Sequence, residues 1–166
     1  MSLEWYAVHT ASHHEQKVHD RLIEKSIYSL FPKMEVWSRR KDRRKRIQIP
    51  LFPGYLFVKA YLENDIWLSI LKTPGVAYVL GNNGKCTPIP ENQITSIQTL
   101  LENDVLISPY PYLKIGHNVR IVNGPLMGCE GMLLREKPNK QRLIVSIDLL
   151  NRSICAEIHE ADVEPI

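Results

Sequence analysis

The chain has 166 residues and a mass of 19.2 kDa, with 44% hydrophobic and 23% charged residues. This composition is typical of a globular protein and excludes a wholly disordered one, and the length suits one ordinary domain or two small ones. No apolar run approaches the roughly 20 residues that span a bilayer, and MSLEWYAVHT lacks the pattern of a secretory signal. We therefore expect a cytoplasmic protein with no membrane partner.

The formal net charge of +3 hides one concentrated basic segment. Residues 39–46 contain one acid and seven basic residues, which are Arg39, Arg40, Lys41, Arg43, Arg44, Lys45 and Arg46. The rest of the chain is net acidic. Clustered Lys and Arg side chains gain free energy near a polyanion because they release its counterions. The segment predicts a nucleic-acid contact that neutralises phosphates, and such contacts position a protein without reading bases.

The first predicted elements are a strand and a helix. Residues 4–10 are rich in aromatic and β-branched types, which favour a strand. Residues 12–26 have apolar side chains at helical spacing, with Ser12 as the N-cap and Glu15 completing a capping box. Spacings of three and four place further candidate nucleic-acid contacts on one face of this helix: His14, Lys17 and Arg21.

The basic segment lies between two runs of alternating polar and apolar residues, 33–38 and 47–49. This pattern predicts a solvent-exposed β-hairpin with the charges at its tip. Further along, residues 55–60 and 76–80 read as strands and 91–102 as a helix. Between them, Asn64 or Asp65 can cap a short helix that carries Ile66, Trp67, Ile70 and Leu71 and ends before Pro74. The order predicts an α+β fold in which an antiparallel sheet is covered by flanking helices.

The pattern changes at Ser108, where two prolines follow within four residues. Because proline removes a backbone donor, we expect a linker over residues 108–114 rather than a helix or a central strand. Five short strand-like runs come next, over residues 118–123, 129–136, 141–147, 152–158 and 162–164. They predict a small five-stranded β-barrel. The predicted domains are therefore 1–107 and 115–166.

The sequence offers no catalytic or metal-binding pattern. The three cysteines are far apart, which favours neither a disulfide framework nor a zinc site. Walker, GxGxxG and GxSxG motifs are absent from the sequence, as is any clustering of acids suited to a metal-dependent nuclease. We expect a protein that is not an enzyme and has no metal or cofactor.

Three local patterns occur in an informative order. Trp5-Tyr6 lies in the first strand, LFPGYLFV over residues 51–58 opens a central strand, and GHNVRIVNGPLMGCEG covers residues 116–131. The third pattern resembles the KOW motif. Together the three resemble the NusG family of transcription elongation factors over roughly residues 4–165. The resemblance implies an N-terminal NGN domain that binds RNA polymerase and a C-terminal KOW barrel.

The FPGY element of residues 52–55 has two interpretations. Its aromatic side chains could simply pack the sheet, or they could form an exposed patch that holds a helical partner. The resemblance favours the second, because in the family this element lines the depression that holds the clamp helices of the largest polymerase subunit. The implied polymerase-binding residues are Phe52, Pro53, Gly54, Tyr55 and Phe57, and Phe57 could equally be core.

The KOW-like motif also has two interpretations. Gly124 and Pro125 suit a tight turn, so the motif could serve only to build the barrel. Leu126 and Met127 would then be displayed at the tip, where an apolar pair favours a partner contact. In the family that partner is a ribosomal protein or the Rho termination factor.

The resemblance implies a factor that binds RNA polymerase and suppresses pausing and termination. The basic hairpin would contact the non-template DNA strand or nascent RNA. The very basic hairpin and the proline-rich linker favour a specialised RfaH-like paralogue, an operon-specific antiterminator. A housekeeping NusG that couples polymerase to Rho or the ribosome is the alternative. A ribosome-associated KOW protein that binds RNA is another, although residues 108–166 hold seven basic and seven acidic residues and so lack the expected charge.

Overall fold

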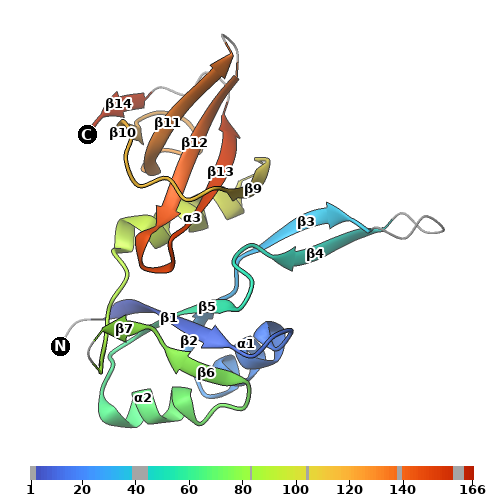
Figure 1. The fold of residues 1–166 in the computed structure, drawn as a ribbon, viewed down its shortest axis with the longest axis vertical. Coiled ribbons are helices and arrows are strands. Elements are labelled where there is room, and N and C mark those ends of the chain that lie inside the picture. The colour runs from blue at the N-terminus through green and yellow to red at the C-terminus, as the bar shows by residue number, and fades with distance from the viewer. Residues whose placement is uncertain (1–2, 39–44, 83, 104, 138–139, 159–162) are drawn as a thin grey trace. The chain divides into compact units, whose positions relative to one another are not determined.

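The computed structural model describes residues 3–38, 45–82, 84–103, 105–137, 140–158 and 163–166. The chain forms two compact units, Met1–Ile89 and Pro90–Ile166 (Figure 1). The α+β class predicted from the sequence is confirmed. Each unit is built on an antiparallel sheet.

The first unit is organised around a four-stranded sheet with the order β2-β5-β1-β6. Its strands are β1 (Glu4–Thr10), β2 (Tyr28–Leu30), β5 (Tyr55–Ala60) and β6 (Val76–Val79). Two helices belong to this unit, α1 (Glu15–Glu24) and α2 (Asn64–Leu71). A separate two-stranded ribbon consists of β3 (Lys33–Trp37) and β4 (Arg46–Pro50), and a small one of β7 (Gly81–Asn82) and β8 (Lys85–Cys86).

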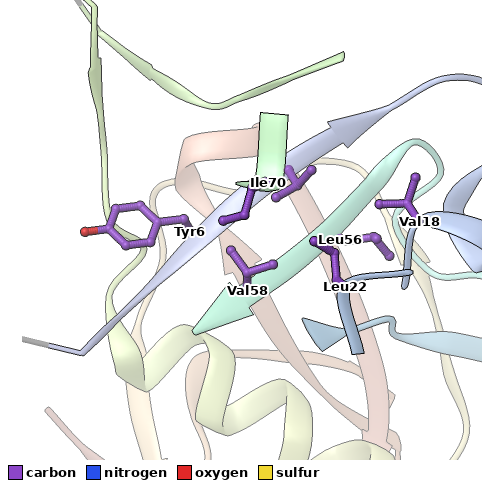
Figure 2. Packing of buried hydrophobic residues seen from close by; sticks show 7 residues of the cluster. Tyr6, Val18, Leu22, Leu56, Val58 and Ile70 are labelled. Carbon is purple, nitrogen blue, oxygen red and sulfur yellow. The ribbon is translucent and has the colours of Figure 1, made fainter. Parts of the chain in front are cut away.

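A hydrophobic core joins one face of this sheet to the two helices (Figure 2). Alternate residues of a strand point to opposite faces, so Leu56 and Val58 of β5 share one face. They pack with Val18 and Leu22 of α1 and with Ile70 of α2, while Tyr6 and Val8 of β1 complete the cluster. Burying each such side chain contributes about 1.5–3 kcal/mol to stability. This packing fixes which face of β1 and β5 is left for other contacts.

The start of α1 differs from the prediction. The helix begins at Glu15, its N-cap is His14, and no side chain caps it, so the predicted capping box with Ser12 does not form. The reason is local: His13 has a φ of 60°, which takes the backbone out of the right-handed helical path. The Ser12 carbonyl instead accepts a hydrogen bond from His14 Nδ1 at 2.7 Å.

The second unit contains α3 (Glu91–Glu102) and a six-stranded antiparallel sheet in the order β14-β10-β11-β12-β13-β9. The strands are β9 (Ile107–Tyr110), β10 (Asn118–Ile121), β11 (Glu130–Lys137), β12 (Lys140–Ile147), β13 (Arg152–Ile158) and β14 (Val163–Pro165), with a 3-10 turn, η1 (Asp148–Leu150), between β12 and β13. All five runs predicted as strands are present. Among the described residues the ladders do not close into a ring, so the predicted barrel is an open sheet here.

Residues 108–110 belong to β9 rather than to a linker. Pro109 is tolerated because β9 is an edge strand that pairs only with β13. The boundary between the compact units also differs from the predicted one, since it falls between Ile89 and Pro90. Helix α3 thus groups with the C-terminal sheet, where Ser96 Oγ accepts a hydrogen bond from the Glu130 backbone at 2.9 Å. This long-range packing has no signature in the local pattern.

Gly131 shows why the KOW-like motif needs a glycine in β11. A Cβ at this position would lie 2.5 Å from the Ile144 carbonyl oxygen of β12, closer than side chains tolerate. Glycine at this position therefore lets β11 and β12 approach closely. Within the described part of the chain, no helix is long and apolar enough to cross a membrane.

Candidate functional site

Aromatic rings line the face of the first sheet opposite the helix-covered core. In the antiparallel register of β1 and β5, Trp5 faces Lys59, Ala7 faces Phe57 and His9 faces Tyr55. Strand β6 adds Tyr78, which pairs with His9. Because side chains alternate along a strand, these residues share one face. We call His9, Tyr55 and Tyr78 the aromatic triplet.

The aromatic triplet lies at the end of β1, where this strand pairs with both β5 and β6. The His9 ring lies 5.0 Å from the ring of Tyr55 and 5.0 Å from that of Tyr78. Tyr78 is 50% exposed, whereas Tyr55 and His9 are half-buried. His9 Nδ1 is buried and has no hydrogen-bond partner among the described residues. The rings form a rigid apolar surface that also offers polar atoms, which is the composition of protein-binding hot spots.

The FPGY turn lies against this triplet. Gly54 has a φ of 85°, a conformation that side chains other than glycine rarely adopt. Its carbonyl accepts a hydrogen bond from the Thr10 backbone at 2.8 Å, and a Cβ on Gly54 would lie 3.4 Å from His9 Cε1. Glycine therefore lets the turn close onto β1, which places Tyr55 beside His9.

Two of the predicted polymerase-binding residues are buried. Phe52 is 2% exposed and Phe57 is 0% exposed, and their rings meet edge to face at 5.6 Å between centroids. Pro53 is exposed, and Gly54 and Tyr55 are half-buried. The expectation of an exposed aromatic ring is therefore wrong for Phe52, and of the two alternatives for Phe57 the structure shows the core one, because these two rings pack on each other beneath the turn. Pro53 and Tyr55 remain accessible.

The predicted basic hairpin is present as β3 and β4, paired from Lys33–Pro50 to Trp37–Arg46. Arg39, Arg40, Lys41, Arg43 and Arg44 lie outside the described residues. Lys45 and Arg46 are described and exposed. Arg46 lies 4.0 Å from the Glu35 carboxylate, and its guanidinium is 5.1 Å from the centre of the Trp37 ring. An ion pair this exposed contributes little stability, so Arg46 stays available to a ligand. The exposed Lys45 is available as well.

The candidate contacts on α1 have different environments. Lys17 is exposed. His14 is half-buried at the N-cap, and Arg21 donates a hydrogen bond from Nη1 to the Pro74 carbonyl at 2.7 Å. Arg21 therefore ties α1 to the loop before β6. Of the three, Lys17 is the side chain most open to a nucleic acid.

The predicted partner loop of the second unit is an exposed, hydrogen-bonded turn. Gly124 and Pro125 are exposed, Leu126 is half-buried and Met127 is 65% exposed. The Met127 backbone donates to the Gly124 carbonyl at 3.1 Å, and the Gly128 backbone donates to Ile121 at 2.8 Å. The turn presents Met127 outward on a fixed backbone, and a flexible thioether adapts well to a partner surface.

Burial and local hydrogen bonds shift the pKa values of several side chains. Burial raises the pKa of the Cys129 thiol to about 11, so the thiol stays protonated and unreactive. Burial, followed by a hydrogen bond to Glu4, raises the pKa of Tyr6 to about 12. Hydrogen bonds from Arg120 and Asn92 lower the pKa of Glu130. Across the described ranges, no group of His, Cys, Asp and Glu side chains could hold a metal ion.

Sequence reasoning missed His9, Tyr78 and Trp37. Each lies in a segment predicted as a strand, but only the pairing of β1 with β6 reveals that His9 and Tyr78 are neighbours. The usable signal was the alternation along β1, which puts His9 on the same face as Trp5.

Comparison with known proteins gives one consistent result. Residues 3–98 match the family model described as "NusG: Transcription termination factor nusG". The chain is 28% identical to a Helicobacter pylori protein named transcription termination/antitermination protein NusG, covering 99% of both chains. It is 25% identical to the Pseudomonas aeruginosa protein of the same name, covering 100% of both. The structure titled "Domain interaction in Thermotoga maritima NusG" matches with a TM-score of 0.60 at 22% identity, covering 100% of this chain and 98% of that one, which supports the fold.

Proposed function

Since the chain belongs to the NusG family of transcription factors, we propose that it binds RNA polymerase through the aromatic triplet and the FPGY turn and suppresses pausing and termination. The observation that carries the proposal is the triplet itself. Tyr55 and Tyr78 flank His9 at 5.0 Å on a sheet face away from the helices, next to the turn whose motif the family uses. The helical clamp of the largest polymerase subunit is the partner we propose.

The chemistry suits a helix docked on an apolar surface. Aromatic anchors dominate interface energies because they bury a large rigid area at low entropic cost. The buried pair of Phe52 and Phe57 would support the surface from below rather than touch the partner. Binding of this kind changes no covalent bond. It acts by population shift, since the factor binds the elongating form of the polymerase more tightly than paused forms.

The basic hairpin supplies the nucleic-acid contact in this proposal. The exposed Lys45 and Arg46 extend a sequence segment with seven basic residues in eight, and such a segment neutralises phosphates. Lys17 of α1 is a further exposed cation. We place the non-template DNA strand or the nascent RNA here. The turn around Met127 in the second unit would recruit a ribosomal protein or Rho.

Within the family we favour an operon-specific antiterminator over a housekeeping factor, on the strength of the very basic hairpin. The housekeeping role remains the alternative. A ribosome-associated RNA-binding role is disfavoured because residues 108–166 carry equal numbers of acids and bases. Measuring read-through of terminators on the operon that encodes this protein and on an unrelated template separates the specialised role from the housekeeping role. Read-through that is confined to one template supports the operon-specific antiterminator.

The polymerase contact is tested with the double variant Tyr55→Ala and Tyr78→Ala. Loss of about 2 kcal/mol at one hot spot weakens binding about 30-fold, so the double variant should no longer co-purify with RNA polymerase of the source organism. The matched control is Tyr61→Ala, an exposed tyrosine of the same unit outside the triplet. Wild-type affinity in the double variant, with an unchanged melting curve, would refute the assignment.

A further inference from the structure

His9 is a polar side chain in a place where an apolar one would cost less free energy. It is half-buried near the end of β1, and its ring lies between those of Tyr55 and Tyr78, at 5.0 Å from each. Its Nδ1 atom is buried and has no hydrogen-bond partner among the described residues. An unpaired buried polar atom is destabilising, and a leucine at this position would not carry one. Packing alone therefore does not explain a histidine here.

The ring of His9 has a covered edge and an open edge. The atoms nearest to the place that a Cβ on Gly54 would take are His9 Cε1, at 3.4 Å, and His9 Nδ1, at 3.6 Å. The FPGY turn thus covers the Nδ1 side of the ring. Nε2, in contrast, is not one of the buried atoms without a partner, and it forms no hydrogen bond within the described part of the chain. Nε2 therefore reaches the surface of the aromatic triplet.

The burial of Nδ1 decides which nitrogen of the neutral ring carries the proton. A neutral imidazole has one N–H donor and one acceptor nitrogen. A proton on Nδ1 would make a buried donor that faces the turn without an acceptor, and orphaned buried N–H groups are rarer than unpaired acceptors. With the proton on Nε2, the donor lies at the surface, where solvent satisfies it. The ring therefore presents Nε2–H outward between two tyrosine rings.

We propose that His9 determines the specificity of the aromatic triplet, because its Nε2–H donates a hydrogen bond to a side-chain oxygen of the polymerase helix that docks there. This inference rests on the polymerase contact proposed above and adds the chemistry that the partner must supply. The oxygen belongs to a side chain because carbonyl groups inside a helix already accept hydrogen bonds within it. A carboxylate and a carboxamide share the acceptor that is required.

The donor adds a selectivity that the rings by themselves lack. Burial of apolar surface is non-directional, so two tyrosine rings accept any apolar helix of suitable shape. A helix that covers His9 also removes solvent from Nε2–H, and an unpaired buried donor then costs free energy. A helix with an oxygen opposite His9 avoids this cost, whereas a helix without one is rejected.

The test compares wild type, His9→Leu and His9→Gln in the full chain, with RNA polymerase of the source organism as the probe. Leucine keeps the apolar bulk and removes the donor, so the affinity should fall about 5- to 150-fold. The amide of glutamine can place a donor near the position of Nε2, so His9→Gln should recover most of that affinity. The matched control is His117→Leu, which replaces an exposed histidine of the second unit and should bind as wild type. The melting temperature of His9→Leu should not fall, because the change removes an unpaired buried atom.

A measurement on the unbound wild-type protein keeps the proposal falsifiable even if a variant unfolds. Long-range proton–nitrogen NMR correlations of isotope-labelled histidine identify the ring nitrogen that carries the proton. The spectrum is recorded at about pH 8, where an ordinary histidine is neutral. The signal of His9 is the one that is missing from His9→Gln. We expect the proton on Nε2, and a proton on Nδ1 would overturn the proposal.

Failure of this inference is distinguishable from failure of the proposed polymerase contact. If the double variant Tyr55→Ala and Tyr78→Ala loses polymerase binding while His9→Leu binds as wild type, the donor role is wrong and the aromatic contact stands. Equal losses in His9→Leu and His9→Gln would also overturn the donor role, since the shape of the ring would then matter rather than its N–H. Wild-type binding by the double variant would remove the polymerase contact itself, and this inference with it.

Discussion

Replacing Phe52 with Ala separates the support beneath the FPGY turn from its contact surface. Phe52 is 2% exposed and packs edge to face on Phe57. Removing a buried phenylalanine ring costs about 3–5 kcal/mol. At about 4–8 °C per kcal/mol for a domain of 60–100 residues, the first unit should melt at least about 12 °C lower. Tyr55→Ala truncates a half-buried ring and should cost about 1 kcal/mol.

The assay for both variants is urea unfolding followed by tryptophan fluorescence. All three tryptophans, Trp5, Trp37 and Trp67, lie in the unit Met1–Ile89, so the signal reports that unit alone. Polymerase binding is then measured at a temperature where Phe52→Ala is folded. We expect near wild-type binding for Phe52→Ala and strongly reduced binding for Tyr55→Ala.

The opposite pattern would refute this reasoning. If Phe52→Ala costs less than about 1 kcal/mol and loses polymerase binding as Tyr55→Ala does, then Phe52 is itself a contact, as the family resemblance implies. Burial would then have been a poor guide to its role. The comparison needs no assumption about the second unit.

Three other predictions concern the turn of the second unit, its sheet and the pH dependence of the first unit. Met127→Asp should abolish recruitment of the ribosomal protein or Rho in pull-downs. Polymerase binding and thermal stability should not change, since Met127 is 65% exposed. Loss of both binding activities together would contradict this prediction. Gly131→Ala should destabilise the second unit by about 1–3 kcal/mol in thermal unfolding, because its Cβ would lie 2.5 Å from the Ile144 carbonyl; unchanged melting would show that β11 and β12 can separate freely. Burial lowers the pKa of His19, so its contribution is full above the unfolded value of about 6.5 and is lost as pH falls through the lowered folded pKa. His19→Gln should flatten this acid-side loss of stability in unfolding measurements. Equal pH profiles for wild type and His19→Gln would exclude the effect.

Much of the local structure follows from the sequence alone. The helices around Val18 and Ile97 and the strand at residues 55–60 were predictable because their apolar residues repeat at helical or strand period. The hairpin of β3 and β4 was predictable because two alternating arms flank a charged run. Its charge, and hence the class of its proposed ligand, is a property of composition that no fold could alter.

The predictions were wrong at the start of α1 and at residues 108–110, and each error has a structural cause. Ser12 and Glu15 have the spacing of a capping box, but the left-handed backbone at His13 moves the N-cap two residues on, from Ser12 to His14. Pro109 argued for a linker, yet an edge strand has one side without ladder partners and tolerates a missing donor. A short pattern cannot tell whether a strand will be central or at an edge.

The candidate site was decided by tertiary structure. His9 and Tyr78 are 69 positions apart in the printed sequence, and only the pairing of β1 with β6 puts their rings 5.0 Å apart. Burial of Phe52 likewise depends on its contact with Phe57 across the turn. The sequence determines which side chains exist and which face of a strand each takes, because alternation is a local property of the backbone. Which strands become neighbours depends on the packing of the whole sheet, and that alone separates the rings that can touch a partner from those that support them.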